Sequence, residues 1–247
     1  MSSHNEPTNN LKISNMSLFI SFVYMKHEAW ASFSKFSYKY RDKSAVADIG
    51  GYMRLFKWDD YGLAVGGDFV VWLGYDVGLI QLDPIYADYY VWFGGFKEVN
   101  NGTWYLFVEH PCLHYIDRLD TLPLYWNATR LMYRERDFEI SVAQYIHSEK
   151  YQFLSRGTDW GMDLKVFKRL RKNFGKDISL FLDGYSFFAL SRNYRKLYAS
   201  LEIKGGLEFI NERGDFTISL GFRPYERTGI VRDAEGVPYV SLKVRGF

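Results

Sequence analysis

The stretch from residue 199 to residue 223, ASLEIKGGLEFINERGDFTISLGFR, decides the fold class of this chain. In its second half, apolar side chains take every other position, at Phe216, Ile218, Leu220 and Phe222. In its first half, the same spacing runs from Ala199 to Phe209. Alternation with period two is typical of a strand with one apolar and one polar face. The Asn211–Gly214 segment between the halves favours a turn, so the stretch predicts a hairpin of two long strands.

The same alternation recurs along the whole chain, for example at 35–41, 138–143 and 160–166. Segments near 45–60, 61–77 and 85–98 indicate a pitch of about 15–20 residues, which suits strands of about ten residues plus turns. About thirteen such segments can be counted, and about twelve remain if the first is an N-terminal extension. The sequence therefore predicts an all-β, closed antiparallel up-and-down barrel of about twelve strands, with ten or fourteen left open.

Composition excludes several other classes of protein. Aromatic residues make up 19% of the chain, with 20 Tyr, 20 Phe and 7 Trp against only 6 Pro, a bias that favours strands. A formal charge of +2 gives no support for a nucleic-acid partner, because such proteins carry a basic patch or stripe. The single cysteine, Cys112, excludes an internal disulfide framework and a multi-cysteine metal site. We expect neither a metal nor a cofactor.

The polar faces of the predicted strands carry charges that suit the lumen of a membrane barrel. The predicted lumen charges are Asp163, Lys165, Glu202, Lys204 and Glu208. A dozen strands also enclose more space than side chains fill, since about eight strands reach that limit. Aromatic residues near strand ends are interpreted as interfacial girdles: Trp58, Tyr61, Tyr89, Tyr90, Trp92, Trp104, Tyr105, Tyr125 and Trp126. The alternative is a soluble ligand-binding barrel, in which the apolar faces would fill the interior.

The domain organisation is predicted to be simple. No low-complexity linker interrupts the alternation, so residues 1–247 are expected to form one barrel domain. Residues 1–25 are expected to be an N-terminal extension, and any export signal to have been removed or to lie outside this sequence. The expected location is the bacterial outer membrane. The expected partners are membrane lipids and lipopolysaccharide, and an outer-membrane or periplasmic protein remains an open possibility.

One apolar segment ends in the sequence EHPCLHYID at residues 109–117. Its His110, His114 and Asp117 match a His-x-x-x-His-x-x-Asp spacing, and the chain thereby resembles an uncharacterised family of bacterial outer-membrane barrels. The order of the flanking motifs is also similar, with Glu6-Pro7, Gly50-Gly51-Tyr52, Gly66-Gly67-Asp68 and 83–89 ahead of the histidines. The chain departs from the resemblance in having Pro-Cys-Leu between the histidines, where small hydroxylated residues are expected. The resemblance implies fold and location and supplies no reaction.

His110, His114 and Asp117 are the first candidates for chemistry. If the strand stays extended, the two histidines lie on one side about 13 Å apart, too far to share a metal. If Pro111 turns the chain, they converge and can bind zinc with Asp117 or act as a general base. The simpler interpretation is a structural polar network that closes the barrel end.

A second candidate is the local string His147-Ser148-Glu149, the compact Ser–His–acid grouping that a lipid hydrolase requires. Side chains of adjacent strand residues point to opposite faces, however, which weakens this candidate. The leading functional hypothesis from sequence is an integral outer-membrane barrel that acts as a narrow pore or as a structural or partner-binding component. The alternatives are a membrane-embedded lipid-modifying hydrolase and the soluble ligand-binding barrel.

Overall fold

The structure is a computed structural model that describes residues 27–37, 45–74, 83–116, 124–148, 160–227 and 235–246. These residues form twelve strands: β1 (His27–Phe36), β2 (Ala45–Trp58), β3 (Tyr61–Gly74), β4 (Asp83–Val99), β5 (Gly102–Tyr115), β6 (Leu124–Arg134), β7 (Phe138–Ser148), β8 (Trp160–Phe174), β9 (Ile178–Ser191), β10 (Leu197–Asn211), β11 (Gly214–Glu226) and β12 (Pro238–Gly246). Within the described ranges, no helix has the length and hydropathy needed to cross a membrane. The predicted extension at residues 1–25 lies outside the described residues.

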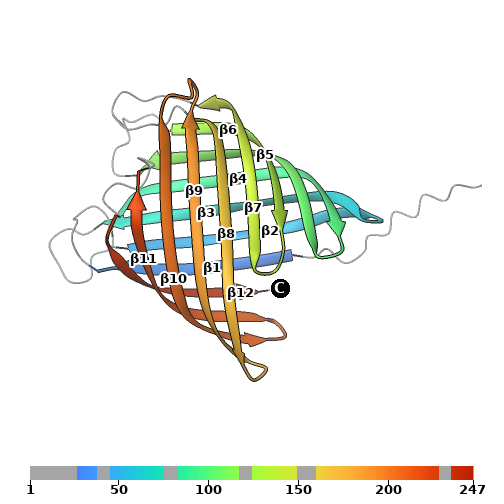
Figure 1. The fold of residues 1–247 in the computed structure, drawn as a ribbon, viewed down its shortest axis with the longest axis vertical. Helices are drawn as coiled ribbons and strands as arrows, with labels where there is room; N and C mark the ends of the chain where they lie inside the picture. The colour runs from blue at the N-terminus through green and yellow to red at the C-terminus, as the bar shows by residue number, and fades with distance from the viewer. Residues whose placement is uncertain are drawn as a thin grey trace, which may run out of the picture.

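Every strand pairs antiparallel with its neighbours in the chain, and β1 closes the sheet by pairing with β12. The closing seam is in register over most of β1, with Phe33 opposite Leu242 and Ala31 opposite Val244. In Figure 1 the strands β8–β11 cross the view steeply, while β1–β5 behind them lie nearly across it. Opposite walls of a barrel cross in this way because each strand is tilted against the barrel axis. The predicted closed up-and-down barrel of about twelve strands is confirmed.

The two ends of the barrel differ in their connections. At one end, tight turns join β2 to β3, β4 to β5, β6 to β7, β8 to β9 and β10 to β11. Two of these turns need a left-handed backbone, at Asp59 (φ 52°) and at Gly175 (φ 79°), where glycine has no steric cost. Longer connections, such as 75–82 and 149–159, leave from the opposite end. In bacterial barrels the short turns face the periplasm and the long loops face outside.

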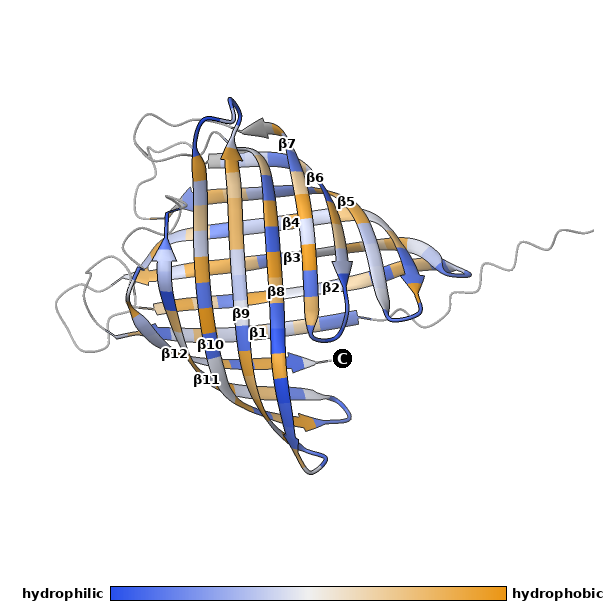
Figure 2. Ribbon diagram, viewed as in Figure 1, coloured by the Kyte–Doolittle hydropathy of each residue, from blue (hydrophilic) through white to orange (hydrophobic). Residues whose placement is uncertain are grey.

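The apolar face of nearly every strand points outward. Large apolar side chains remain exposed on the barrel wall along β11 and β12, at Phe216, Ile218, Leu220, Phe222, Val240, Leu242 and Val244. Figure 2 shows the alternation of apolar and polar residues along individual strands. Their inward neighbours Asp215, Thr217, Ser219 and Ser241 are buried. An apolar exterior around a polar interior is the arrangement of a membrane-spanning barrel, and the soluble alternative, which needs a dry apolar centre, is wrong.

The predicted aromatic girdle is only partly correct. Trp58, Tyr61, Tyr89 and Trp104 are exposed on the outer wall, whereas Tyr105 and Trp126 are buried inside the barrel. Tyr90 and Trp92 also face inward, since they share the inward parity of their strand with Phe96. The prediction used position along the strand and ignored which face each residue occupies.

The glycine pairs 66–67 and 94–95 lie in regularly paired segments of β3 and β4. Gly66 lies in regular register opposite Trp92, and Gly94 lies opposite Phe107 on one side and Ala64 on the other. A Cβ atom on Gly66 would come within 2.6 Å of the Trp92 ring, and one on Gly94 within 2.2 Å of the Leu106 carbonyl oxygen. Gly66 therefore makes room for an inward aromatic ring, and Gly94 allows the close approach of the neighbouring β5 backbone.

A charge on the outer wall is expected to destabilise the barrel according to its depth. Leu220 lies midway along β11 and is 69% exposed, so Leu220→Arg is expected to cost about 2–4 kcal/mol in lipid vesicles. The control Tyr225→Arg, near the strand end, is expected to cost about 0–1 kcal/mol. Urea unfolding in vesicles, followed by the heat-modifiable gel shift, measures both. Equal losses at the two positions would contradict the membrane depth assigned to β11.

Candidate functional site

The middle of the lumen is crossed by a buried ion-pair network centred on Arg130. The guanidinium donates to both carboxylate oxygens of Glu109 at 2.8 Å and to both oxygens of Asp163 at 2.7 Å. Arg130 also donates to Ser141, while Tyr90 and Tyr145 donate their hydroxyls to Glu109 and Asp163. The side chains of Arg130, Glu109 and Asp163 are at most 2% exposed. Such a network persists because nearly every lone pair and proton in it has a partner.

A second ion-pair cluster lies nearer the short-turn end. Arg169 pairs with Asp183 at 2.6 Å and with Glu208 at 2.9 Å, and Arg171 also bonds to Glu208. Ser179 donates to the same glutamate at 3.0 Å. Neighbouring lumen charges thus neutralise one another rather than face water alone.

The structure places all five predicted lumen charges on the inward faces of their strands. Asp163 and Glu208 belong to the two clusters above, and Glu202 pairs with Arg223 at 2.6 Å. Lys204 lies 3.9 Å from Asp183. Lys165 faces a cavity in the long-connection half of the lumen. Sequence reasoning did not identify Arg130 as the centre of the network, because its partners lie on three different strands.

Aromatic side chains occupy much of the remaining lumen. One cluster includes Trp72, Tyr86, Trp126, Trp160 and Phe187, and the rings of Trp126 and Trp160 stack at 5.6 Å between centroids. A second, nearer the short-turn end, includes Phe96, Tyr105 and Phe107. These rings and ion pairs fill space that the sequence analysis assigned to a lumen too wide for side chains.

Removal of the Arg130 side chain is expected to lower the stability of the barrel strongly. Arg130→Met would leave Glu109 and Asp163 buried without a cation, and breaking a buried pair in this way typically costs about 3–5 kcal/mol. The triple variant Arg130→Met, Glu109→Gln, Asp163→Asn removes all three charges and is expected to recover part of that loss. Urea unfolding in detergent, followed by tryptophan fluorescence, measures whether the triple variant is more stable than the single variant. A triple variant less stable than the single one would contradict the charge-pairing explanation.

The predicted His110 and His114 lie elsewhere, on the outer face of β5. Along β5 the inward residues are Tyr105, Phe107 and Glu109, which are buried, while Leu106 and Val108 are exposed outside. The strand stays extended through Pro111 as far as Tyr115. His110, Cys112 and His114 therefore share the outward positions of Leu106 and Val108, but the Cys112 side chain is buried, at 9% exposure, and also lines an internal cavity. The hypothesis that Pro111 turns the chain and brings the histidines together is wrong.

These outward polar residues contact one another and the next strand. The imidazole Nδ1–H of His110 donates to Asn127 Oδ1 on β6, with 2.8 Å between the two atoms. The Cys112 thiol contacts His114 Nε2 at 2.8 Å. Tyr89 meets the His114 ring edge-on at 5.1 Å, and Tyr125 packs by the His110 ring at 5.7 Å. We call the four residues His110, Cys112, His114 and Asn127 the outer-wall cluster.

Local irregularities in the sheet coincide with the outer-wall cluster. Pro111 has no N–H to donate, and the β5–β6 pairing is interrupted at His110 and Pro111 between the pairs Glu109–Ala128 and Cys112–Tyr125. On the other side of β6, the register with β7 shifts between Asn127 and Ala128. Bulges are over-represented beside active sites, where they re-aim side chains.

The cluster lies close to the outer edge of the membrane. Cys112 is ten residues beyond Gly102, the first residue of β5 at the short-turn end. A strand that rises about 3.3 Å per residue and tilts by about 40° places it about 25 Å above that end, the usual height of the apolar band. The cluster thus faces the lipid near the level of the headgroups.

The remaining sequence candidates lie outside what the structure describes. Asp117 and Glu149 are outside the described residues, and the side chains of His147 and Ser148 are not described. Among the described residues, no group of three or more His, Cys, Asp or Glu side chains could hold a metal ion. Sequence reasoning missed Cys112 and Asn127. Cys112 could have been found from sequence, because it lies two residues from each histidine and therefore on the same side of an extended strand. Asn127 could not, because its closeness to His110 depends on how β5 and β6 pair.

Thiol, imidazole and carboxamide form a recognised chemical set. In the Cys–His–Asn variant of the catalytic triad, the thiol attacks a carbonyl, the imidazole carries the proton, and the amide orients the imidazole. The Nδ1–H bond to Asn127 leaves the His110 Nε2 lone pair available as a base.

Comparisons with known proteins support the fold. No family model matches the chain, and no curated protein matches it in sequence. Among solved structures it is similar to outer membrane phospholipase A from Escherichia coli, with a TM-score of 0.52 and 11% identity over 91% of this chain and 98% of that one. It is also similar to the translocator domain of the autotransporter NalP from Neisseria meningitidis (TM-score 0.41, 7% identity, 92% and 90% covered).

The chain is therefore a membrane-spanning β-barrel with the fold of bacterial outer-membrane proteins. Its closed sheet, its apolar exterior and this shared fold agree with the predicted localisation in the outer membrane.

Proposed function

We propose that the chain is an outer-membrane acyl hydrolase that cleaves ester bonds of membrane lipids, with Cys112 as its nucleophile. The observation that carries this proposal is the outer-wall cluster. The Cys112 thiol contacts the His114 imidazole, and the neighbouring His110 imidazole is hydrogen-bonded to Asn127. A nucleophile, two candidate bases and an orienting group thus lie along one short segment of two adjacent strands.

The residues have distinct roles in this proposal. His110 is the general base, because its Nδ1–H bond to Asn127 fixes the tautomer with a free Nε2. His114 holds the sulfur in the resting arrangement, through the 2.8 Å contact with Cys112. Catalytic contacts often tighten only when substrate is bound, so the thiol turns from His114 toward His110 in the reacting complex.

The reaction follows the two-step course of a covalent hydrolase. His110 takes the thiol proton as Cys112 sulfur attacks the ester carbonyl carbon, and a carbon–sulfur bond forms. The ester carbon–oxygen bond then breaks, and the imidazolium returns the proton to the leaving alcohol. Water next attacks the thioester with His110 as base, which releases a carboxylic acid and restores the thiol. No oxidant, reductant or cofactor is required.

Lipid is the proposed substrate class because of position and fold. The cluster faces the membrane near headgroup level, where the ester groups of phospholipids and lipopolysaccharide lie. The shared fold with outer membrane phospholipase A, whose name records hydrolysis of phospholipids, adds support. Membrane lipids and lipopolysaccharide are accordingly proposed as partners, while a protein partner stays a prediction.

The proposal is tested by fatty-acid release from phosphatidylethanolamine in mixed micelles. Cys112→Ala is expected to abolish hydrolysis, and His110→Ala to reduce it by about 10²–10⁴-fold, the usual contribution of a general base. Asn127→Ala is expected to cause a smaller loss than His110→Ala. Thr129→Ala is the matched control, since Thr129 is the next residue on the same face of β6, and it is expected to retain full activity.

Two results would overturn the assignment: no hydrolysis by the unmutated protein, or full activity in Cys112→Ala. Because Cys112 is the single cysteine of the chain, a thiol-alkylating reagent can modify only this residue. Its side chain is buried, so the remaining activity is compared with the extent of labelling, and full activity in fully labelled protein contradicts the assignment. His114→Ala separates the two histidines. Retained activity in this variant supports His110 as the base, whereas a loss as large as that of His110→Ala assigns the base to His114.

A pore, the leading hypothesis from sequence, receives less support from the lumen. Among the described residues, the Arg130 network and the two aromatic clusters occupy part of the lumen. We expect no discrete ion-conductance steps from the protein in planar bilayers. Arg130→Ala is the comparison variant, since loss of the central cation opens the only route through that network. Steady channels in the unmutated protein would restore the pore hypothesis.

A further inference from the structure

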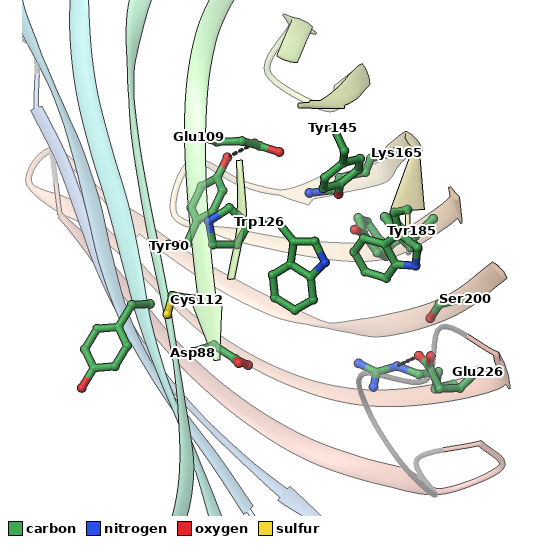
Figure 3. A pocket seen from close by; sticks show the side chains of 15 residues that line it. Asp88, Tyr90, Glu109, Cys112, Trp126, Tyr145, Lys165, Tyr185, Ser200 and Glu226 are labelled. Atoms are coloured by element: carbon green, nitrogen blue, oxygen red, sulfur yellow. Dashed lines mark hydrogen bonds and ion pairs between the residues drawn. The ribbon is translucent and has the colours of Figure 1, made fainter. Parts of the chain in front are cut away.

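A cavity of about 270 Å³ lies inside the barrel, in the half nearer the long connections. Seven aromatic residues contribute to its wall: Tyr89, Tyr90, Trp126, Tyr145, Trp160, Tyr185 and Phe187. Figure 3 shows Trp126 in the middle of the view, with Tyr145, Lys165 and Tyr185 on the side facing it. An aromatic enclosure with a few polar groups is the usual character of a small-molecule site, and its size suits a ligand of about a dozen heavy atoms.

The carboxylates around the cavity already have partners. Glu109 accepts from Arg130 and Tyr90, and Asp88 accepts from the Trp72 indole at 2.9 Å. Glu226 lies 3.9 Å from the Arg223 Nε atom (Figure 3). The charge of Glu109 is thus compensated by Arg130, Glu226 faces Arg223, and one Asp88 oxygen is satisfied by a neutral donor.

The cations at the wall retain capacity to bind. Within the described part of the chain, Lys165 forms no hydrogen bond or ion pair, and its ammonium lies 6.0 Å from the centre of the Phe187 ring. Glu109 faces Lys165 from across the lumen, but both of its oxygens bind Arg130. One Nη atom of Arg223 donates a hydrogen bond to Glu202 at 2.6 Å. The other Nη atom is buried and has no hydrogen-bond partner among the described residues. Donors, rather than acceptors, are thus in excess at the cavity.

We propose that this cavity binds a small amphipathic organic anion, whose acidic group meets Lys165 and Arg223 while its apolar body lies among the aromatic rings. Desolvated cations that meet a carboxylate form charge-assisted hydrogen bonds, which are stronger than neutral ones. The aromatic walls accept an aryl or short alkyl body and exclude water from the charged contact. Cys112 of the outer-wall cluster also lines this cavity, but Lys165 and Arg223, on which the proposal rests, have no role in the hydrolase proposal.

The probe for this site is 4-phenylbutyrate, which is an anion of suitable size and carries no ester to hydrolyse. It is titrated into the detergent-solubilised full chain and followed by tryptophan fluorescence, because Trp126 and Trp160 lie in the wall. Micelles without protein provide the baseline. We expect saturable binding, and at least tenfold weaker binding of the neutral 4-phenylbutanol and of the cationic 4-phenylbutylamine.

Variants then locate the binding. Lys165→Met is expected to weaken 4-phenylbutyrate binding at least tenfold, whereas Lys168→Met, on the exposed face of the same strand, is expected to leave it unchanged. Binding is followed by tryptophan fluorescence and hydrolysis by fatty-acid release, so failure of this proposal is distinguishable from failure of the hydrolase. Absence of saturation, equal affinity for the acid and the alcohol, or unchanged affinity in Lys165→Met would each overturn it. The acid–alcohol comparison needs no variant and holds even if Lys165→Met fails to fold.

Discussion

The closed hydrogen-bond ladder is the constraint on which the rest of this structure depends. Hydrocarbon offers no partner for a backbone N–H or C=O, so a sheet can cross a membrane only if it has no free edge. The pairing of β1 with β12 removes the edge. Once the sheet is closed, the direction of each side chain follows from its position along the strand, and a slip of one residue would turn a whole row of leucines into the lumen.

Because successive side chains alternate between the two faces, a single strand can carry an internal ion pair on one face and an outward polar cluster on the other. On β5, Glu109 points inward and joins the Arg130 network, while His110 and Cys112 point outward. The inner charges are matched by partners and mainly stabilise the barrel, because an unpaired charge there would be costly. The outward His110 bonds to Asn127 and Cys112 contacts His114, near the level of the headgroups. Pro111 and the β6–β7 register shift bend the regular ladder at this position.

Much of the fold was predictable, because alternation is a local signal that repeats from residue 27 to residue 246 and turn residues mark its breaks. The candidate site was predictable only in part. His110 and His114 were found by their spacing, although the expected turn at Pro111 does not form. Cys112 was read as a departure from a family pattern, and Asn127 was not considered. The prediction of an aromatic girdle was wrong for Tyr105 and Trp126, which point into the barrel. Closeness to a strand end does not say whether a side chain points to the lumen or to the lipid.

The amino-acid sequence by itself determined the strand pattern, the apolar outer wall and the polar lumen, because these depend only on the two-residue period and on the medium around the barrel. Only the tertiary structure decided which side chains meet. Arg130 and Asp163 are 33 residues apart, and His110 and Asn127 are 17 apart. Such pairings depend on the register between strands, which is set by closure, turn lengths and bulges acting together. No local pattern in the chain encodes that register.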